Sequence, residues 1–108
     1  MMDTLNELYK VILSRKENPA EGSYTAYLFD KGIDKILKKV GEECAEVIIA
    51  SKNNENSEIL YEIADLTYHL LVLMAEKGIA LTELEDELGE RAKKQGNLKE
   101  MKVTDKNT

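Results

Sequence analysis

Cysteine and histidine are almost absent from this chain. A single cysteine, Cys44, among 108 residues leaves no partner for an intrachain disulfide, and with one histidine there is no Cys/His cluster for a zinc site. A lone thiol inside a helical pattern is typical of a reducing compartment, so we expect a cytoplasmic protein. The first residues contain no apolar run fit for a signal peptide.

Positive charge and long hydrophobic runs are also scarce. The 21 acidic residues outnumber the 15 basic ones, and the formal net charge is −6. This balance argues against a nucleic-acid partner, because nucleic-acid binding requires a basic face. The apolar run from Leu70 to Ala75 is far too short to span a membrane, so we expect no membrane partner either. The length is that of one domain with a small core.

Strand patterns are missing, and helix signals fill most of the chain. The only proline, Pro19, falls in a polar link. Capping-box patterns occur at Thr4 and Thr82, and Gly32 and Gly78 follow apolar periodic segments as stop signals. We therefore predict an all-α fold, an antiparallel bundle of about five helices, over residues 4–16, 23–31, 34–52, 57–77 and 82–94.

The fourth predicted helix is apolar nearly all round, which requires cover on all sides. Five helices of this size cannot easily enclose one of their own, so we expect a homodimer, or a larger symmetric assembly, in which a second subunit completes the core. The alternative is that the first and fifth helices provide enough cover. The domain is expected to span 1–94, with 95–108 as a polar, partly disordered tail. The apolar face predicted for the third helix consists of Ile33, Ile36, Val40, Cys44, Val47 and Ile48.

Two acidic pairs of matched spacing interrupt these apolar stripes. The first is Glu43 and Glu46 in the third predicted helix, and the second is Glu62 and Asp65 in the fourth. If the helices form an antiparallel hairpin, Glu46 lies level with Glu62, and Glu43 with Asp65. Four carboxylates this close resist joint ionisation unless a cation lies among them, and oxygen ligands favour Mg²⁺. The alternative is that each pair is a solvated face, although charges bordering a core are costly unless paired.

Two side chains beside the pairs are further candidates. Glu42 precedes the first pair and points further toward solvent, so it either binds a metal through water or is simply exposed. His69 lies one helical turn after Asp65 and can contact it. It either holds that carboxylate in place as a second-shell partner of the metal or is a structural histidine.

Substrate contacts are predicted at two places. Lys35 and Lys39 lie on the side of the third helix that carries the carboxylates, where they either meet phosphate oxygens or are ordinary surface lysines. Tyr24 and Thr25 in the short second helix either contact a substrate or only pack.

The runs that carry these residues resemble the phosphoribosyl-ATP pyrophosphatase family. The most specific segments are the KxxGEExxE run of 38–46 and the ExxDLxYHLLVL run of 62–73, and the resemblance covers about 5–91. It implies the all-α, MazG-like fold of NTP pyrophosphohydrolases and a dimer. It also implies that Mg²⁺ is held by Glu43, Glu46, Glu62 and Asp65, with Glu42 as an assisting residue.

The reaction that the resemblance implies is hydrolysis of phosphoribosyl-ATP to phosphoribosyl-AMP and pyrophosphate, the second step of histidine biosynthesis. The candidates for orienting the attacking water are Glu42 and Glu46, and Lys39 and Lys35 would offset phosphate charge. Some relatives carry a fused cyclohydrolase domain with zinc-binding cysteines, which this chain lacks, so we expect a monofunctional enzyme. The tail after Arg91 departs from the pattern of many relatives.

Two other functions fit the same residues. A house-cleaning pyrophosphohydrolase acting on nucleoside triphosphates such as dCTP or dUTP would use the same metal site. A helical dimerisation module without enzymatic activity would need no Mg²⁺ at all.

Overall fold

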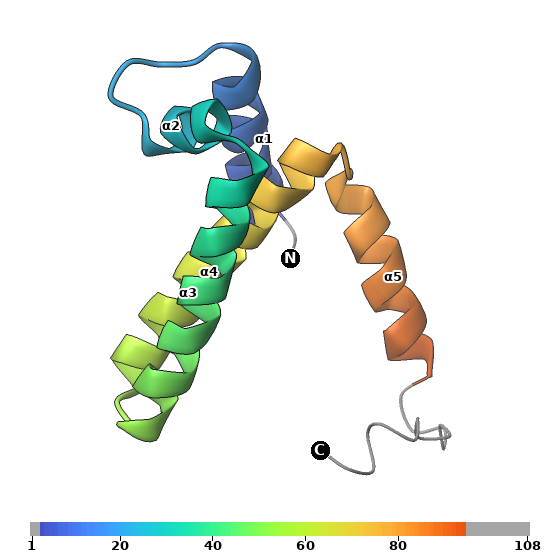
Figure 1. The fold of residues 1–108 in the computed structure, drawn as a ribbon. Helices are drawn as coiled ribbons and strands as arrows, with labels where there is room; N and C mark the ends of the chain where they lie inside the picture. The colour runs from blue at the N-terminus through green and yellow to red at the C-terminus, as the bar shows by residue number, and fades with distance from the viewer. Residues whose placement is uncertain (1–2, 95–108) are drawn as a thin grey trace.

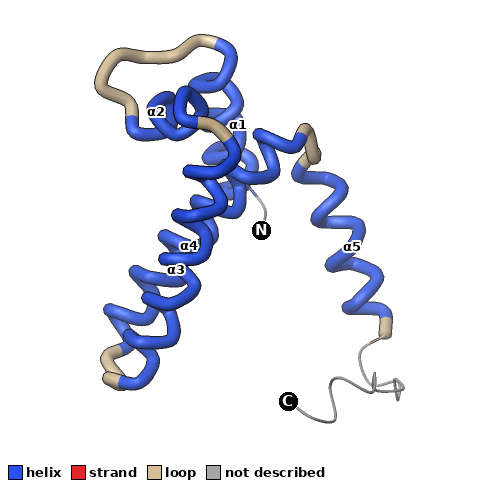
Figure 2. The backbone as a smooth tube through the Cα atoms, viewed as in Figure 1, coloured by secondary structure: helices blue, strands red, loops and turns tan. Residues whose placement is uncertain are grey.

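The computed structural model describes residues 3–94, all of them in helices and short connections, with no strand in that part of the chain (Figures 1 and 2). The predicted tail, 95–108, lies outside the described residues. The helices are α1 (Asp3–Glu17), α2 (Tyr24–Lys31), α3 (Ile33–Lys52), α4 (Asn56–Lys77) and α5 (Leu81–Lys93). The all-α prediction is confirmed, and each predicted helix end agrees within one residue.

The centre of the molecule is the antiparallel hairpin of α3 and α4, the longest and most closely associated pair of helices (Figure 1). A three-residue turn joins them, and its central residue, Asn54, has a φ of 60°. Asparagine tolerates this left-handed backbone better than most residues, which explains the sharp reversal here. The hairpin brings the two predicted acidic pairs onto facing helices.

The helices α1 and α2 pack at the end of the hairpin away from this turn (Figure 1). Gly32, at a φ of 92°, separates α2 from α3 and lets the chain change direction where a side chain would be strained. Polar contacts also hold α1 on the C-terminal end of α4. The Lys16 ammonium donates to the Ala75 carbonyl at 2.9 Å, and the Tyr9 hydroxyl donates to the Ile79 carbonyl. The core shared by these elements consists of Tyr9, Ile12, Leu28, Ile36, Leu71, Val72, Ala75 and Leu81.

The predicted capping boxes at Thr4 and Thr82 are wrong in detail. The first helix already begins at Asp3, so Thr4 lies inside it. The fifth begins at Leu81, and the Ala80 N–H donates to the Glu83 carboxylate at 2.9 Å. This contact is the glutamate half of a capping box, two residues earlier than predicted, and it lets Leu81 enter the core.

The prediction for the apolar face of α3 is wrong at two of its positions, Cys44 and Ile48, whereas Val47 is half-buried. Ile36 is buried as expected, but Cys44 is exposed and Ile48 is 65% exposed. The buried stripe of this helix passes instead through Glu43 and Ala50, which face α4. Rotating the buried stripe in this way places an acidic side chain inside the hairpin and leaves aliphatic side chains outside it.

The helix α5 stands apart from the hairpin and does not cover it (Figure 1). Of its side chains, only Leu81 is buried. Large aliphatic and aromatic side chains of α3 and α4 therefore remain exposed within this single chain: Leu37, Ile48, Ile49, Leu60, Tyr61, Ile63 and Leu70. None of the five helices combines the length and apolar character needed to cross a membrane.

Candidate metal centre

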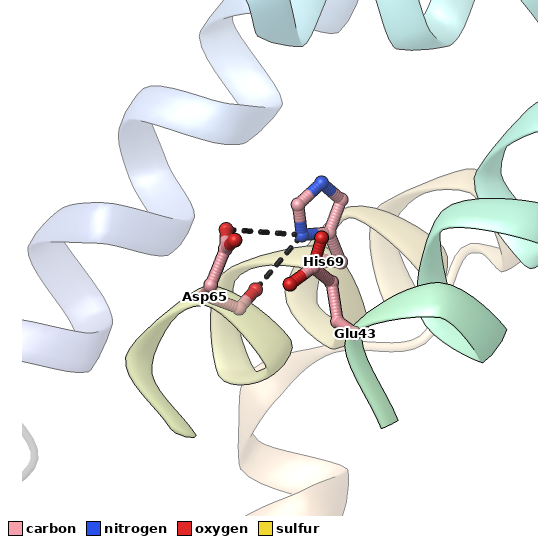
Figure 3. Close-up of side chains that lie close together, drawn as sticks. All are labelled: Glu43, Asp65 and His69. Carbon is pink, nitrogen blue, oxygen red and sulfur yellow. Dashed lines mark hydrogen bonds and ion pairs between the residues drawn. The ribbon is translucent and has the colours of Figure 1, made fainter. Parts of the chain in front are cut away.

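Glu43, Asp65 and His69 come together in the middle of the hairpin (Figure 3). Each offers one possible ligand atom, and these atoms lie within 4.8 Å of one another. Glu43 comes from α3, whereas Asp65 and His69 are one turn apart on α4. The pairing of Glu43 with Asp65 is the one that matched spacing about the turn predicts.

Glu43 is buried, at only 7% exposed, although it is an acid. Burial raises its pKa from 4.5 to about 7, and hydrogen bonding and charge from Asp65 act in the same direction. The charge of Glu62 also raises it, whereas the Lys39 ammonium opposes the change. A second carboxylate beside a buried one is costly without a cation, so this pair suits the binding of a positive ion.

His69 is held by contacts at both ring nitrogens. Its Nδ1 lies 2.8 Å from the Asp65 backbone carbonyl and 3.4 Å from the Asp65 carboxylate, as the dashed lines in Figure 3 show. A carbonyl oxygen only accepts, so Nδ1 carries a proton, and in that tautomer Nε2 accepts from the Tyr24 hydroxyl at 3.0 Å. With its Nδ1 proton facing Asp65, the imidazole supports that carboxylate and leaves metal binding to the carboxylate oxygens.

Glu46 and Glu62 lie one helical turn nearer the connection between α3 and α4. Both line a hollow of about 360 Å³ between α3 and α4, together with Ile49, Ala50, Asn53, Ser57, Glu58 and Tyr61. The two residues thus share one side of the hairpin and do not fall on separate surfaces. They are not members of the tight group formed by Glu43, Asp65 and His69.

The predicted lysines lie at different distances from the carboxylates. The Lys39 ammonium is 3.2 Å from Glu42 and 3.7 Å from Glu43, and its hydrogen bond to Glu42 is the main reason that its pKa is raised. Lys35 lies further out, with its ammonium 5.9 Å from the centre of the Tyr27 ring. The Glu42 side chain is 47% exposed, in keeping with its predicted position toward solvent.

The hydroxyls of Tyr24 and Thr25 both have partners within the chain. Tyr24 bonds His69, and Thr25 bonds the Tyr68 hydroxyl. Tyr68 was not predicted as a site residue, although its ring also lies edge-on to His69 with centroids 4.9 Å apart. Its position three residues after Asp65, on the same helical face, was the available signal.

The donor set fits a hard divalent cation. Glu43 and Asp65 supply oxygen ligands from facing helices, and burial is the main reason that the pKa of Glu43 is raised. The Lys39 ammonium neutralises part of the negative charge but is shared with Glu42. The described structure therefore contains an acidic cluster able to bind a metal ion.

Comparison with known proteins covers most of the chain. Residues 5–92 match the family described as Phosphoribosyl-ATP pyrophosphohydrolase. The chain is 60% identical to the "Phosphoribosyl-ATP pyrophosphatase" of Listeria welshimeri over 101 residues, which are 94% of this chain and 97% of that protein. It is 56% identical to the protein of the same name from Clostridium novyi over 98 residues, 91% of this chain and 89% of that one.

A longer relative is similar over only part of its own length. The "Histidine biosynthesis bifunctional protein HisIE" of Caldanaerobacter subterraneus is 61% identical over 93 residues, which are 86% of this chain and 45% of that protein. The match to the family extends from α1 to α5 and includes every candidate residue described above. The chain belongs to the phosphoribosyl-ATP pyrophosphohydrolase family.

Proposed function

We propose that this chain hydrolyses phosphoribosyl-ATP to phosphoribosyl-AMP and pyrophosphate, the second step of histidine biosynthesis. The observation that carries the proposal is the pair of facing carboxylates, Glu43 and Asp65, inside a hairpin whose sequence belongs to this family. Catalysis of phosphoryl transfer depends mainly on positioning the substrate and neutralising its charge. A cation held by a buried acidic pair would do both.

The proposed ligands of Mg²⁺ are Glu43, Glu46, Glu62 and Asp65, with Glu42 assisting through water. When bound, Mg²⁺ would neutralise phosphate oxygens and favour departure of pyrophosphate. His69 donates its Nδ1 proton toward Asp65 and so fixes the orientation of that carboxylate. Lys39 lies beside Glu42 and Glu43, within reach of the same phosphates.

Glu42 and Glu46 are proposed to orient the attacking water and accept its proton. Glu42 is half exposed beside Lys39, and Glu46 lines the open hollow with Glu62. A general base needs access to water as well as to the reacting phosphorus, and both positions offer that access. The buried Glu43 does not.

The working unit is proposed to be a homodimer in the cytoplasm. Leu37, Cys44 and Ile48 lie along one exposed face of α3, and Leu60, Ile63 and Leu70 form an exposed stripe on α4. An apolar surface of this extent on a chain of 108 residues is typical of an interface. A second copy of the chain would cover the side of the hairpin that α5 leaves open.

A substrate panel tests the activity. Pyrophosphate release is measured from phosphoribosyl-ATP, dCTP and dUTP, with and without Mg²⁺. We expect Mg²⁺-dependent release that strongly favours phosphoribosyl-ATP. Preference for dCTP or dUTP would identify a house-cleaning enzyme, and no release from any of them would refute an enzymatic role.

Variants at the acidic pairs test the site itself. Glu46→Ala and Asp65→Ala should abolish turnover while the helical circular dichroism stays intact. Glu58→Ala is the matched control, because Glu58 lines the same hollow as Glu46 but is outside the proposed ligand set. Retained turnover in both test variants would show that the ligands lie elsewhere.

A further inference from the structure

A strip of aromatic and basic side chains extends from the acidic pairs along α2 and the start of α3. It consists of Tyr24, Tyr27, Lys31 and Lys35, and we call it the Tyr27 strip. The two rings are stacked with centroids 6.1 Å apart and an angle of 26° between their planes. The ammonium groups of Lys31 and Lys35 lie 5.8 and 5.9 Å from the centre of the Tyr27 ring.

The strip is continuous with the candidate metal centre. Its inner end is Tyr24, whose hydroxyl bonds His69, the partner of Asp65. One turn after Lys35, Lys39 contacts Glu43. A ligand anchored at the carboxylates would therefore reach the strip with its remaining groups.

The strip is also open to solvent and cationic in an otherwise acidic protein. Tyr24 is 45% and Tyr27 is 41% exposed, so both rings are accessible to a ligand. Both rings contribute to a hollow of about 580 Å³, a size that accommodates a nucleoside. Asp30 lines the same hollow and offers acceptors for ribose hydroxyls.

The proposed substrate has two charged ends joined by adenine. One end is the triphosphate, which the metal centre would neutralise. The other is the phosphate monoester on the second ribose, which needs cations of its own, and the adenine between them needs a flat surface for stacking. The carboxylates of the metal centre suit neither of these two groups.

We propose that the Tyr27 strip binds the part of phosphoribosyl-ATP beyond the triphosphate. Tyr24 and Tyr27 stack with adenine, and Lys31 and Lys35 bind the phosphate monoester. This inference rests on the proposed function. It makes the strip the element that separates phosphoribosyl-ATP from ordinary nucleoside triphosphates, which carry no second phosphate.

Competitive inhibition by the product tests the lysines. Phosphoribosyl-AMP and AMP differ only by the phosphoribosyl group, so the ratio of their inhibition constants isolates the contacts to that group. In the Lys31→Ala/Lys35→Ala double variant, the constant for phosphoribosyl-AMP should rise about tenfold while that for AMP changes less than about twofold. Lys35→Arg, paired with native Lys31, should keep most of the affinity.

Two further variants separate stacking from general charge. Tyr27→Leu should weaken phosphoribosyl-AMP and AMP alike, by about fivefold or more, because both carry adenine. Lys38→Ala removes the same charge from an exposed lysine of α3 outside the strip and should leave both constants within about twofold.

Each outcome has a definite meaning. Equal weakening of both inhibitors by the lysine double variant, or a similar effect of Lys38→Ala, would mean general electrostatic attraction and would overturn the inference. Unchanged inhibition constants in the lysine and Tyr27 variants would also overturn the inference. The proposed function would stand in that case, provided that the wild-type protein hydrolyses phosphoribosyl-ATP. A wild-type protein that releases no pyrophosphate from phosphoribosyl-ATP would overturn both.

Discussion

Replacing Glu43 by glutamine should make the metal-free protein more stable at alkaline pH. The carboxyl is buried beside Asp65, and its pKa is raised to about 7. In an unfolded chain the same group ionises near 4.5. The contribution of protonated Glu43 to the free energy of unfolding is therefore fully present below about pH 4.5. It is lost as the pH rises through 7, because the carboxyl must then ionise inside the hairpin. Glutamine keeps the shape and carries no charge.

The size of the effect follows from the pKa. At about 1.4 kcal/mol per pH unit, ionising Glu43 in the folded state costs at most about 3 kcal/mol. Asp65 is 32% exposed, so solvent screens part of the repulsion, and we expect about 1–2 kcal/mol. For a domain of this size that corresponds to a gain of about 5–15 °C in melting temperature at pH 8.

Thermal melts followed by circular dichroism provide the assay. Wild type and Glu43→Gln are compared from pH 5 to pH 8 in buffer with a chelator, and the difference in melting temperature should grow with pH. Glu42→Gln is the control, because the same change at a half-exposed side chain should give no such trend. Adding Mg²⁺ should stabilise wild type and not Glu43→Gln. A difference that is absent at pH 8, or independent of pH, would refute this account of Glu43.

Two other variants test the support of the site and the assembly. Tyr24→Phe keeps the ring but leaves Nε2 of buried His69 without its donor, so activity at limiting Mg²⁺ should fall roughly tenfold and recover in part at high Mg²⁺. An unchanged Mg²⁺ dependence would show that the Tyr24 hydroxyl does not orient Asp65 through His69. Ile48→Glu should convert a dimer to monomers in sedimentation velocity, whereas Leu88→Glu, on exposed α5, should not. A dimer that survives Ile48→Glu would place the interface on another face.

The helices and the central acidic contact were predictable because both follow from local spacing. Apolar periodicity and glycine stops determine the helix ends, and a short turn between antiparallel helices makes Glu43 level with Asp65. His69 was predicted beside Asp65 for the same reason, since one helical turn separates them. These relations need no knowledge of the rest of the fold.

Contacts between distant elements were not predictable in this way. The bond from Tyr24 to His69 joins residues 45 positions apart, and it depends on how α2 docks on α4. Glu43 is buried in place of Cys44 because the buried face of α3 is rotated by one residue from the predicted face. The apolar pattern cannot resolve so small a rotation, since alanine and valine occupy several faces of this helix. The position of α5 is a third such case, because its amphipathic sequence is compatible with any apolar neighbour.

The short link between α3 and α4 limits how this protein can vary in length. A residue inserted in the helical part between Glu46 and Glu62 would advance the following carboxylates by about 1.5 Å and swing them by about 100° around their axis. Asp65 would then turn away from Glu43. The connection from Asn18 to Ser23 lies outside the hairpin, so a change of length there would leave Glu43 and Asp65 level.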